Sequence, residues 1–447
     1  MNSESTITAA DIQGFDAGFD AERANRIAMN AVTKNGVYKS ASGSDAVQKD
    51  THEFSISLEQ GDITNQKQSG RCWMFAALNV MRSHMIRTRG LKNFELSQSY
   101  LFFYDKLEKS NYFLENILET LDKPVTDRVV SFLLHDLVSD GGQWDMLYSL
   151  VEKYGVVPKT AYPETVSSSA SREMNTCLQE KLRGDACILR QKHAQNADMD
   201  ALRAEKKRMM EDIYRILCIC LGKPPRTFDF EYRDKDDHFF RECGLTPKSF
   251  YDKYIGLNLS DYVSIIHAPT QDKPFHRSYT VRFLGNVKEG RPVRYVNLPI
   301  ETLKRAAIAQ MRDGEPVWFG CDVGKRSDRD TGILDTALYD FESLFDSAFP
   351  MTKAQRLDYG ESMMTHAMTF QGVNLDEEGK PSRWRVENSW GKDPGHDGYY
   401  VMSDAWFDEF VYQVVVDKKY LTADELAAYG STPIELEPWD PMGSLAL

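Results

Sequence analysis

The stretch "NQKQSGRCWMF", residues 65–75, places one cysteine directly ahead of an amphipathic helix. The apolar residues that follow recur at the spacing of one helical face: Met74, Leu78, Met81 and Met85. Cys72 is therefore expected at or just before the first turn, where a helix N-terminus stabilises a thiolate. Gly70 allows the chain to approach closely just before it. These features make Cys72 a candidate nucleophile.

The composition indicates a soluble protein with more than one lobe. The chain has 447 residues, too many for one ordinary core, and 42% apolar and 27% charged residues are typical of globular proteins. The net charge of −13 disfavours a nucleic-acid-binding surface, although a local basic patch stays open. Residues 1–20 lack the features of a signal peptide, and no apolar run is long enough to cross a membrane.

The seven cysteines are scattered along the chain and do not follow the spacing of a disulfide framework. Without a secretory signal they predict reduced thiols and a cytoplasmic location. Cys218 and Cys220 form a close pair at the end of a predicted helix, but no second pair completes a zinc site. We therefore expect neither a metal ion nor another cofactor.

Changes of periodicity divide the chain into five segments. A polar stretch near residue 166 leads into a long amphipathic helix capped by Asp198, and short apolar runs between Gly, Asp and Pro turns fill the last third. We predict an N-terminal extension packed on the catalytic core, a helical lobe, a mostly helical insertion, a sheet lobe, and a C-terminal helix with an extended arm. Their bounds are 1–60, 61–165, 166–290, 291–420 and 421–447.

A thiolate nucleophile needs an imidazole partner, and His366 is the best placed of the nine histidines. It begins an apolar strand in "MMTHAMTF", where its ring can be held rigidly. Asn388, in "VENSWGKDPG", starts the turn after the next strand, and its amide oxygen can orient the ring. Trp390 can shield that bond from water. The Cys72 N–H and the Gln66 amide are candidate donors to an oxyanion.

Each of these features also has an ordinary structural explanation. Most cysteines in helices are buried filler, a histidine at a strand start is more often part of the core, and asparagine is common in turns. Trp390 also fits core filling, and Gly141–Gly142 in "DGGQW" fits a tight loop. The order and context of all of them together favour a functional site.

Together, "NQKQSGRCW", "DGGQW", "THAM" and "ENSWG" resemble the papain-like cysteine peptidases, most closely their cytoplasmic bleomycin hydrolase or aminopeptidase C branch. Further stretches, from "FELSQSYLFFYDKLEKSNYFLE" to "EPWDPMGSLAL", extend the likeness over nearly the whole chain. The sequence departs from the papain pattern twice. Gly70 and Arg71 replace part of the Cys-Gly-Ser stretch, and His366 follows Cys72 at about twice the usual spacing. The insertion at 166–290 accounts for most of that excess.

The resemblance implies an α+β fold: a papain-like pair of lobes, one helical and one an antiparallel barrel-like sheet, with a large helical insertion. It also implies a mechanism. Cys72 would attack the scissile carbonyl to form an acyl-enzyme, and His366 would accept the thiol proton and later activate water. Asn388 would orient His366, and Gln66 would help to hold the oxyanion.

The same resemblance assigns residues that surround the substrate. Gly141 and Gly142 match the loop that pairs with the substrate backbone, and Trp73 and Trp390 are supporting residues. No metal ion takes part.

The C-terminal arm is the implied specificity device. In relatives the last residues lie in the active-site cleft, which assigns the carboxylate of Leu447, with Ala446 behind it, to the substrate α-amine. The implied protein is a cysteine aminopeptidase that acts on oligopeptides with free N-termini and on amide drugs such as bleomycin. Relatives in this branch form homo-hexamers around an inner chamber, and the insertion would supply contacts.

Two alternatives stay open. If the arm does not dock, the enzyme is a cytoplasmic endopeptidase or oligopeptidase, because a free tail blocks nothing. A non-catalytic chamber or a nucleic-acid-binding role is the second alternative. The intact set of Cys72, His366 and Asn388 and the acidic net charge oppose it.

Overall fold

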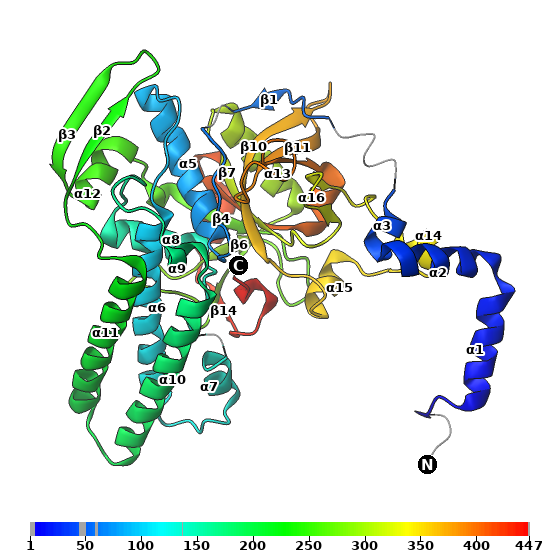
Figure 1. Cartoon of the computed structure of the whole chain (residues 1–447), viewed down its shortest axis with the longest axis horizontal. Coiled ribbons are helices and arrows are strands. Elements are labelled where there is room, and N and C mark those ends of the chain that lie inside the picture. Colours follow the sequence, from blue (N-terminus) through cyan, green and yellow to red (C-terminus); the bar gives the residue numbers. More distant parts are fainter. Residues whose placement is uncertain (1–4, 44–50, 59–60, 136, 446–447) are drawn as a thin grey trace.

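The computed structural model describes residues 5–43, 51–58, 61–135 and 137–445. It confirms the α+β fold, with a helical lobe and a sheet lobe that meet along one helix, α5 (Cys72–Arg89) (Figure 1). The predicted stripe of α5 is buried, and the helix ends at Gly90, whose φ of 59° suits glycine. Because α5 packs on β10 (His366–Leu375), the start of the helix lies at the junction of the lobes.

The helical lobe continues with three helices around α5. Ser97 caps the start of α6 (Gln98–Glu119), since its hydroxyl accepts the Tyr100 N–H at 3.1 Å. A short helix, α7 (Arg128–Leu133), follows. The helix α8 (Trp144–Tyr154) starts directly after the Gly141–Gly142 loop, so that loop is anchored at the lobe interior.

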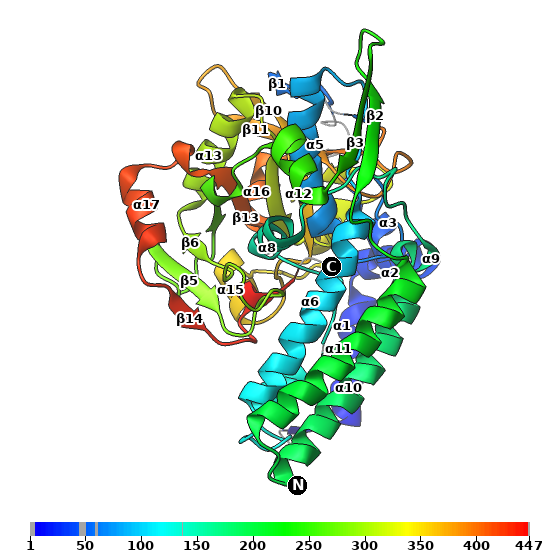
Figure 2. The same cartoon turned by 90° about the vertical axis from the view of Figure 1, so that its left-hand side faces the viewer.

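The long helices of the inserted segment lie in its first half. The helices α9 (Val166–Ser169), α10 (Arg172–Ala194) and α11 (Met199–Leu221) follow one another, and α10 and α11 lie against α6 in a long bundle (Figure 2). As predicted, Asp198 caps α11 and Gly222 follows its end. The charged stretch after it, expected in a helical region, forms a hairpin of β2 (Phe228–Arg233) and β3 (Phe239–Leu245).

The sheet lobe is a 12-stranded sheet among the described residues, in the order β14-β5-β6-β4-β13-β7-β10-β11-β12-β9-β8, with β1 paired to β10. The remaining strands are β1 (Ile56–Ser57), β4 (Tyr262–Ile266), β5 (Arg277–Val281), β6 (Tyr295–Asn297), β7 (Val317–Cys321), β8 (Ser327–Asp328), β9 (Ile333–Leu334), β11 (Pro381–Glu387), β12 (Tyr399–Ser403), β13 (Val411–Asp417) and β14 (Ile434–Leu436). Both β4 and β5 lie inside the segment 166–290 that we predicted as the insertion. The strands of the sheet lobe therefore begin earlier in the chain than expected. Pairing with distant strands, which local periodicity does not encode, explains the difference.

Short helices connect the strands or cover the sheet. They are α12 (Pro247–Phe250), α13 (Ile300–Arg312), α14 (Phe341–Phe345), α15 (Lys353–Asp358), α16 (Asp404–Phe410) and α17 (Ala423–Gly430). Among the described residues, no helix is both long and apolar enough to span a membrane.

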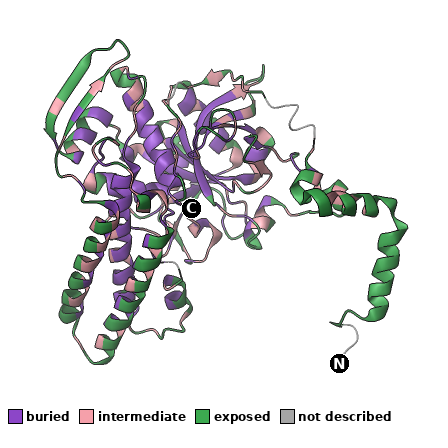
Figure 3. Cartoon of the chain, in the orientation of Figure 1, coloured by how far each residue is buried: buried purple, intermediate pink, exposed green. Residues whose placement is uncertain are grey.

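The N-terminal extension differs from its expected packing. Its helices α1 (Ala9–Ala21) and α2 (Arg23–Asn35) contain no buried residue and project away from the body (Figures 1 and 3). The extension meets the sheet lobe through α2 and α3 (Val37–Ala41), which lie beside α14, and through β1, which pairs with β10. The first two helices lack the cover that their apolar residues would have in a core.

Candidate active site

Cys72 is the first residue of α5, and its side chain is fully buried. Burial raises the pKa of the thiol to about 12, while the backbone N–H groups of Ala367, Trp73 and Cys72 itself act to lower it. Because Ala367 directly follows His366, its contact with the sulfur places Cys72 at the start of β10. A buried thiol of this kind becomes a nucleophile when a neighbouring base takes its proton.

His366 begins β10, as predicted, and its ring is held by Asn388. The ring nitrogen Nε2 lies 3.0 Å from Asn388 Oδ1, and that oxygen also accepts the Ser389 N–H at 2.8 Å. Since an amide oxygen only accepts hydrogen bonds, Nε2 carries the proton of the His366–Asn388 bond. The Trp390 ring covers this pair, with its centroid 4.9 Å from that of the imidazole.

Gln66 lies in the loop before α5 and is fixed by three hydrogen bonds. Its amide Nε2 donates to the Ser69 carbonyl at 2.6 Å, and its Oε1 accepts the Ser389 hydroxyl at 2.6 Å. The Gln66 N–H also donates to the Ser389 carbonyl at 2.8 Å. These bonds tie the loop before Cys72 to the residue after Asn388. The second N–H of the Gln66 amide can therefore serve an oxyanion from a fixed position.

The loop of Gly141 and Gly142 is shaped by two buried lysines of α6. Lys109 Nζ donates to the carbonyls of Ser139 at 2.8 Å and Gly141 at 2.6 Å, and Lys106 Nζ donates to the Val138 carbonyl at 2.6 Å. Charged donors to backbone carbonyls form strong hydrogen bonds. These bonds hold the backbone of the loop in one conformation.

Asp140 joins that loop to the residues before Cys72. Its carboxylate accepts the Gly70 N–H at 3.0 Å and pairs with Lys106 at 2.6 Å. Burial alone would raise the pKa of Asp140, but Lys106 and the hydroxyl and amide donors of α10 hold it well below its usual range. Asp140 is therefore ionised at neutral pH, and it holds the glycine loop and the loop before Cys72 in a fixed relative position.

Trp73 fills the space behind these loops. Its indole N–H donates to the Asp140 carbonyl at 2.7 Å, and its own carbonyl accepts the Trp318 indole N–H at 3.0 Å from the sheet lobe. A Cβ on Gly142 would lie 2.5 Å from the Trp73 ring, so only glycine fits there without a shift. Trp73 thus links the nucleophile helix, the glycine loop and the sheet.

The C-terminal arm docks across the junction of the lobes. The Ser444 carbonyl accepts the Gln143 amide N–H at 2.8 Å from the helical lobe, and the Ser444 hydroxyl donates to the Met364 carbonyl at 2.6 Å from the sheet lobe. Gln143 directly follows Gly142, and Met364 lies two residues before His366. The arm therefore enters the site between its two walls. The predicted substrate contacts Ala446 and Leu447 lie outside the described residues.

Upstream contacts hold the arm in this position. Strand β14 pairs with β5, Lys273 pairs with Asp440 at 2.9 Å, and the guanidinium of Arg128 lies 3.7 Å from the centroid of the Trp439 indole ring. The stacking on Arg128 makes Trp439 an anchor of the arm. The alternative of a free tail does not describe residues up to 445, where Leu445 packs on the main core.

The structure brings Cys72, His366, Asn388 and Gln66 to one place, with Gly141, Gly142, Trp73 and Trp390 around them. Sequence reasoning missed the residues that hold this set, chiefly Lys106, Lys109, Asp140, Gln143 and Ser389. Three of these lie inside quoted motifs, since "DGGQW" contains Asp140 and Gln143 and "ENSWG" contains Ser389. Nothing in the sequence marked the two lysines as buried, because lysine in an amphipathic helix is usually exposed.

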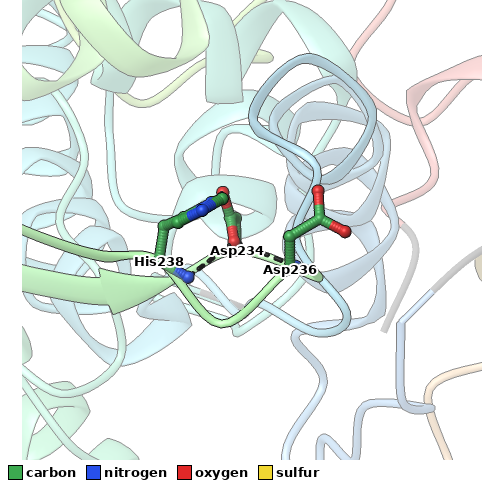
Figure 4. A group of neighbouring side chains, drawn as sticks. All are labelled: Asp234, Asp236 and His238. Carbon is green, nitrogen blue, oxygen red and sulfur yellow. Dashed lines mark hydrogen bonds and ion pairs between the residues drawn. The ribbon is translucent and has the colours of Figure 1, made fainter.

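A second group of potential ligands lies apart from this site. Asp234, Asp236 and His238 cluster at the tip of the β2–β3 hairpin (Figure 4). Asp234 accepts the N–H groups of Asp236 and His238, each at 2.9 Å, and the His238 ring at 3.0 Å. These bonds close a tight turn, and turn chemistry accounts for the cluster.

Comparisons with known proteins agree with this geometry. The model of the peptidase C1-like family matches residues 6–443. The chain belongs to that family. Among its relatives, Aminopeptidase C of Streptococcus thermophilus is 54% identical over 430 residues, covering 96% of this chain and 97% of the relative. Aminopeptidase C of Listeria monocytogenes is 48% identical and covers 99% of this chain and 100% of the relative.

A solved structure of the family has the same fold along its whole length. PepW from Lactobacillus rhamnosis superposes with a TM-score of 0.98 at 53% identity, covering 99% of this chain and 100% of that one. The predicted resemblance to the aminopeptidase C and bleomycin hydrolase branch is thereby confirmed at the level of the family.

Proposed function

We propose that this enzyme, a cysteine-type aminopeptidase of the peptidase C1-like family, removes N-terminal residues from oligopeptides with Cys72 as its nucleophile. The relatives named Aminopeptidase C support the activity. The observation that carries the mechanism is the meeting of Cys72, His366 and Asn388 beside a docked C-terminal arm.

Proton transfer within the site provides the nucleophile. With its pKa raised to about 12 by burial, the Cys72 thiol is neutral at pH 7 until His366 accepts its proton. Because Asn388 holds Nε2, the ring nitrogen that receives the proton is Nδ1. The resulting thiolate–imidazolium pair stabilises both charges, and the start of α5 adds a favourable dipole.

The reaction then follows two acyl-transfer steps. Cys72 Sγ forms a bond to the scissile carbonyl carbon, and the oxyanion accepts hydrogen bonds from the Gln66 amide and the Cys72 N–H. His366 returns its proton to the leaving amine as the C–N bond breaks. It then removes a proton from water, which attacks the thioester and releases the amino acid.

In this proposal the C-terminal arm recognises the α-amine of the substrate. The hydrogen bonds of Ser444 to Gln143 and Met364 support this role, because they hold the arm between the two lobes. We assign the carboxylate of Leu447, supported by Ala446, to the α-ammonium group of the substrate. A carboxylate at that point also excludes substrates whose chain extends beyond the N-terminal residue. The cleft of an endopeptidase thereby acts as that of an aminopeptidase.

Three further properties belong to the same proposal. The substrates include amide drugs such as bleomycin, whose amide bond requires the same chemistry. All seven cysteines are free, which suits a reducing compartment such as the cytoplasm. The enzyme assembles into a homo-hexamer, in which the insertion at 166–290 supplies contacts and the uncovered helices α1 and α2 add a second contact surface. The exposed large apolar residues of these two helices are Ile12, Phe15, Phe19, Ile27 and Met29.

The nucleophile is tested by hydrolysis of leucyl-coumarylamide together with labelling by a thiol alkylator. Cys72→Ala should abolish both hydrolysis and the rapid phase of labelling, whereas Cys187→Ser, at an exposed cysteine, should leave both unchanged. Hydrolysis that survives in Cys72→Ala would assign the chemistry to another group. Sedimentation of a chain without residues 1–35 tests the assembly, since loss of the contact surface should release smaller species.

A further inference from the structure

An open hollow of about 650 Å³ adjoins the nucleophile loop on the side of the inserted lobe. Its wall is built from the loop before Cys72, the residues before Gly141, and the first two turns of α10. The lining residues that the argument uses are Lys67, Gly70, Asp140, Arg172 and Asn175.

The position of this hollow relative to Cys72 follows from the chain. Gly70 lies two residues before the nucleophile, and Asp140 lies one residue before Gly141. The Gly70 N–H donates to the Asp140 carboxylate at 3.0 Å, so the two loops meet at the floor of the hollow. A substrate residue whose carbonyl lies at Cys72 and whose backbone lies along Gly141 is bracketed by these two loops. Its side chain therefore has the hollow beside it.

The inserted lobe closes the far wall. The Gln68 N–H donates to the Ser169 carbonyl at 2.9 Å, and Asn175 Nδ2 donates to Asp140 at 2.7 Å. These bonds hold the start of α10 against the nucleophile loop. Arg172, the first residue of α10, stands at the rim because of this attachment.

The charges around the hollow are unbalanced. The side chains of Lys67 and Arg172 are exposed and have no recorded carboxylate partner among the described residues. Asp140 is the one acidic residue in the described lining, and its charge is compensated by Lys106 at 2.6 Å. Glu173, the acidic residue in the first turn of α10, is not part of the lining. The N-terminal end of α10 adds a partial positive charge.

We infer that this hollow receives the side chain of the residue to be removed, and that Lys67 and Arg172 make the enzyme favour an acidic side chain there. The inference rests on the proposed function, because it takes the substrate amine to lie at the arm and the scissile carbonyl at Cys72. Arg172 belongs to the inserted lobe, which holds it at the rim of the hollow. The insertion therefore contributes to substrate selection as well as to the fold.

Glutamyl- and glutaminyl-coumarylamide test the inference, because these substrates differ in charge and hardly in shape. The ratio of their kcat/KM values is independent of the fraction of active enzyme. In the double variant Lys67→Glu/Arg172→Glu the Glu-to-Gln ratio should fall about tenfold or more, as expected for reversal of two partly solvated charges. The preference of the wild type should weaken in 0.5 M salt, because exposed charges are screened.

Lys207→Glu is the matched control, since it reverses an exposed charge on α11 outside the hollow. A ratio that is the same in the double variant as in Lys207→Glu overturns the inference. N-acetyl-leucyl-coumarylamide separates this failure from failure of the proposed function. Cleavage of the blocked substrate at the rate of its free-amine twin would refute amine reading, whereas an unchanged Glu-to-Gln ratio would refute only the role of Lys67 and Arg172.

Discussion

At the scale of single residues, the site depends on side chains that hydrogen bonds hold in one orientation. Gln66 is held at its oxygen by Ser389 and at one N–H by Ser69, so its remaining N–H has one direction in which to point. Preorganised donors of this kind cost nothing to orient during the reaction. Asn388 fixes the His366 ring in the same way.

Gln66→Ala should therefore reduce kcat about 100-fold or more with little change in KM, because the oxyanion forms only after substrate is bound. Steady-state kinetics with leucyl-coumarylamide measure the split. Ser389→Ala, which removes only the support of the Gln66 oxygen, should lower kcat by a smaller factor. An effect of Gln66→Ala on KM alone would assign this residue to ground-state binding.

Gly142→Ala should destabilise the protein by about 1–3 kcal/mol, because the added methyl group would meet the Trp73 ring. Gly184→Ala is the control, since nothing lies within 4 Å of its Cβ position in the middle of α10. That change should raise the free energy of unfolding by up to about 1 kcal/mol. Urea unfolding compares the two. Equal stability of Gly142→Ala and the wild type would show that Trp73 can move aside freely.

At the scale of elements, a buried ion pair aligns α5 with β11. Arg82 of α5 pairs with Glu387 of β11 at 2.5 Å, and both side chains are at most 1% exposed. Asn79 and Gln371 complete the carboxylate's partners at 3.1 and 2.6 Å. Because Glu387 directly precedes Asn388, this pair sets where Asn388 stands relative to the nucleophile helix.

Arg82→Ala should cost about 3–5 kcal/mol, because it leaves the Glu387 carboxylate buried without its cation. Lys380→Ala removes a partner from the exposed pair with Glu378, in which each side chain is 75% exposed, and should change stability by less than about 0.5 kcal/mol. Thermal and urea unfolding measure both. A loss for Arg82→Ala as small as that for Lys380→Ala is incompatible with this alignment role.

Lys353, the first residue of α15, should make the free energy of unfolding depend on pH. Burial lowers the pKa of its ammonium group to about 7, although Nζ donates to the carbonyls of Asp408 and Val411. Above pH 7 the folded state therefore binds fewer protons than the unfolded state, and the free energy of unfolding rises with pH. Between pH 7 and 9 this group should raise the free energy of unfolding by about 2 kcal/mol. In Lys353→Met the rise should be absent, which urea titrations at the two pH values test. A rise of the same size in the variant rules out Lys353 as its source.

The sequence predicted the elements whose signals are local. The stripe after Cys72 and the cap at Asp198 predicted two helices, and the apolar run after His366 predicted the strand that carries it. The hairpin at 228–245 was not predicted, because its charged residues alternate on an exposed two-stranded ribbon with little apolar periodicity. Buried Lys106 and Lys109 were invisible for a related reason: only the tertiary fold supplies the carbonyls that satisfy them.

At the scale of the whole molecule, the C-terminal arm and the inserted lobe in the middle of the chain complete the site. The arm from β14 to Leu445 runs between the lobes, and the inserted lobe closes the hollow beside the nucleophile loop. The arm thereby bounds the active-site cleft on one side, and the inserted lobe gives it a charged wall on another. The uncovered helices α1 and α2 point away from both, toward the contacts that we propose with other copies.

The central claim is that the docked arm makes this cysteine peptidase an aminopeptidase. The most direct measurement compares hydrolysis of leucyl-coumarylamide and its N-acetylated twin by the wild type and by a chain that lacks residues 444–447. The wild type should cleave only the free amine, and the truncated chain should accept the blocked twin, because both the carboxylate and the obstruction are gone. Unchanged selectivity in the truncated chain would contradict the account and assign the reading of the amine to other residues.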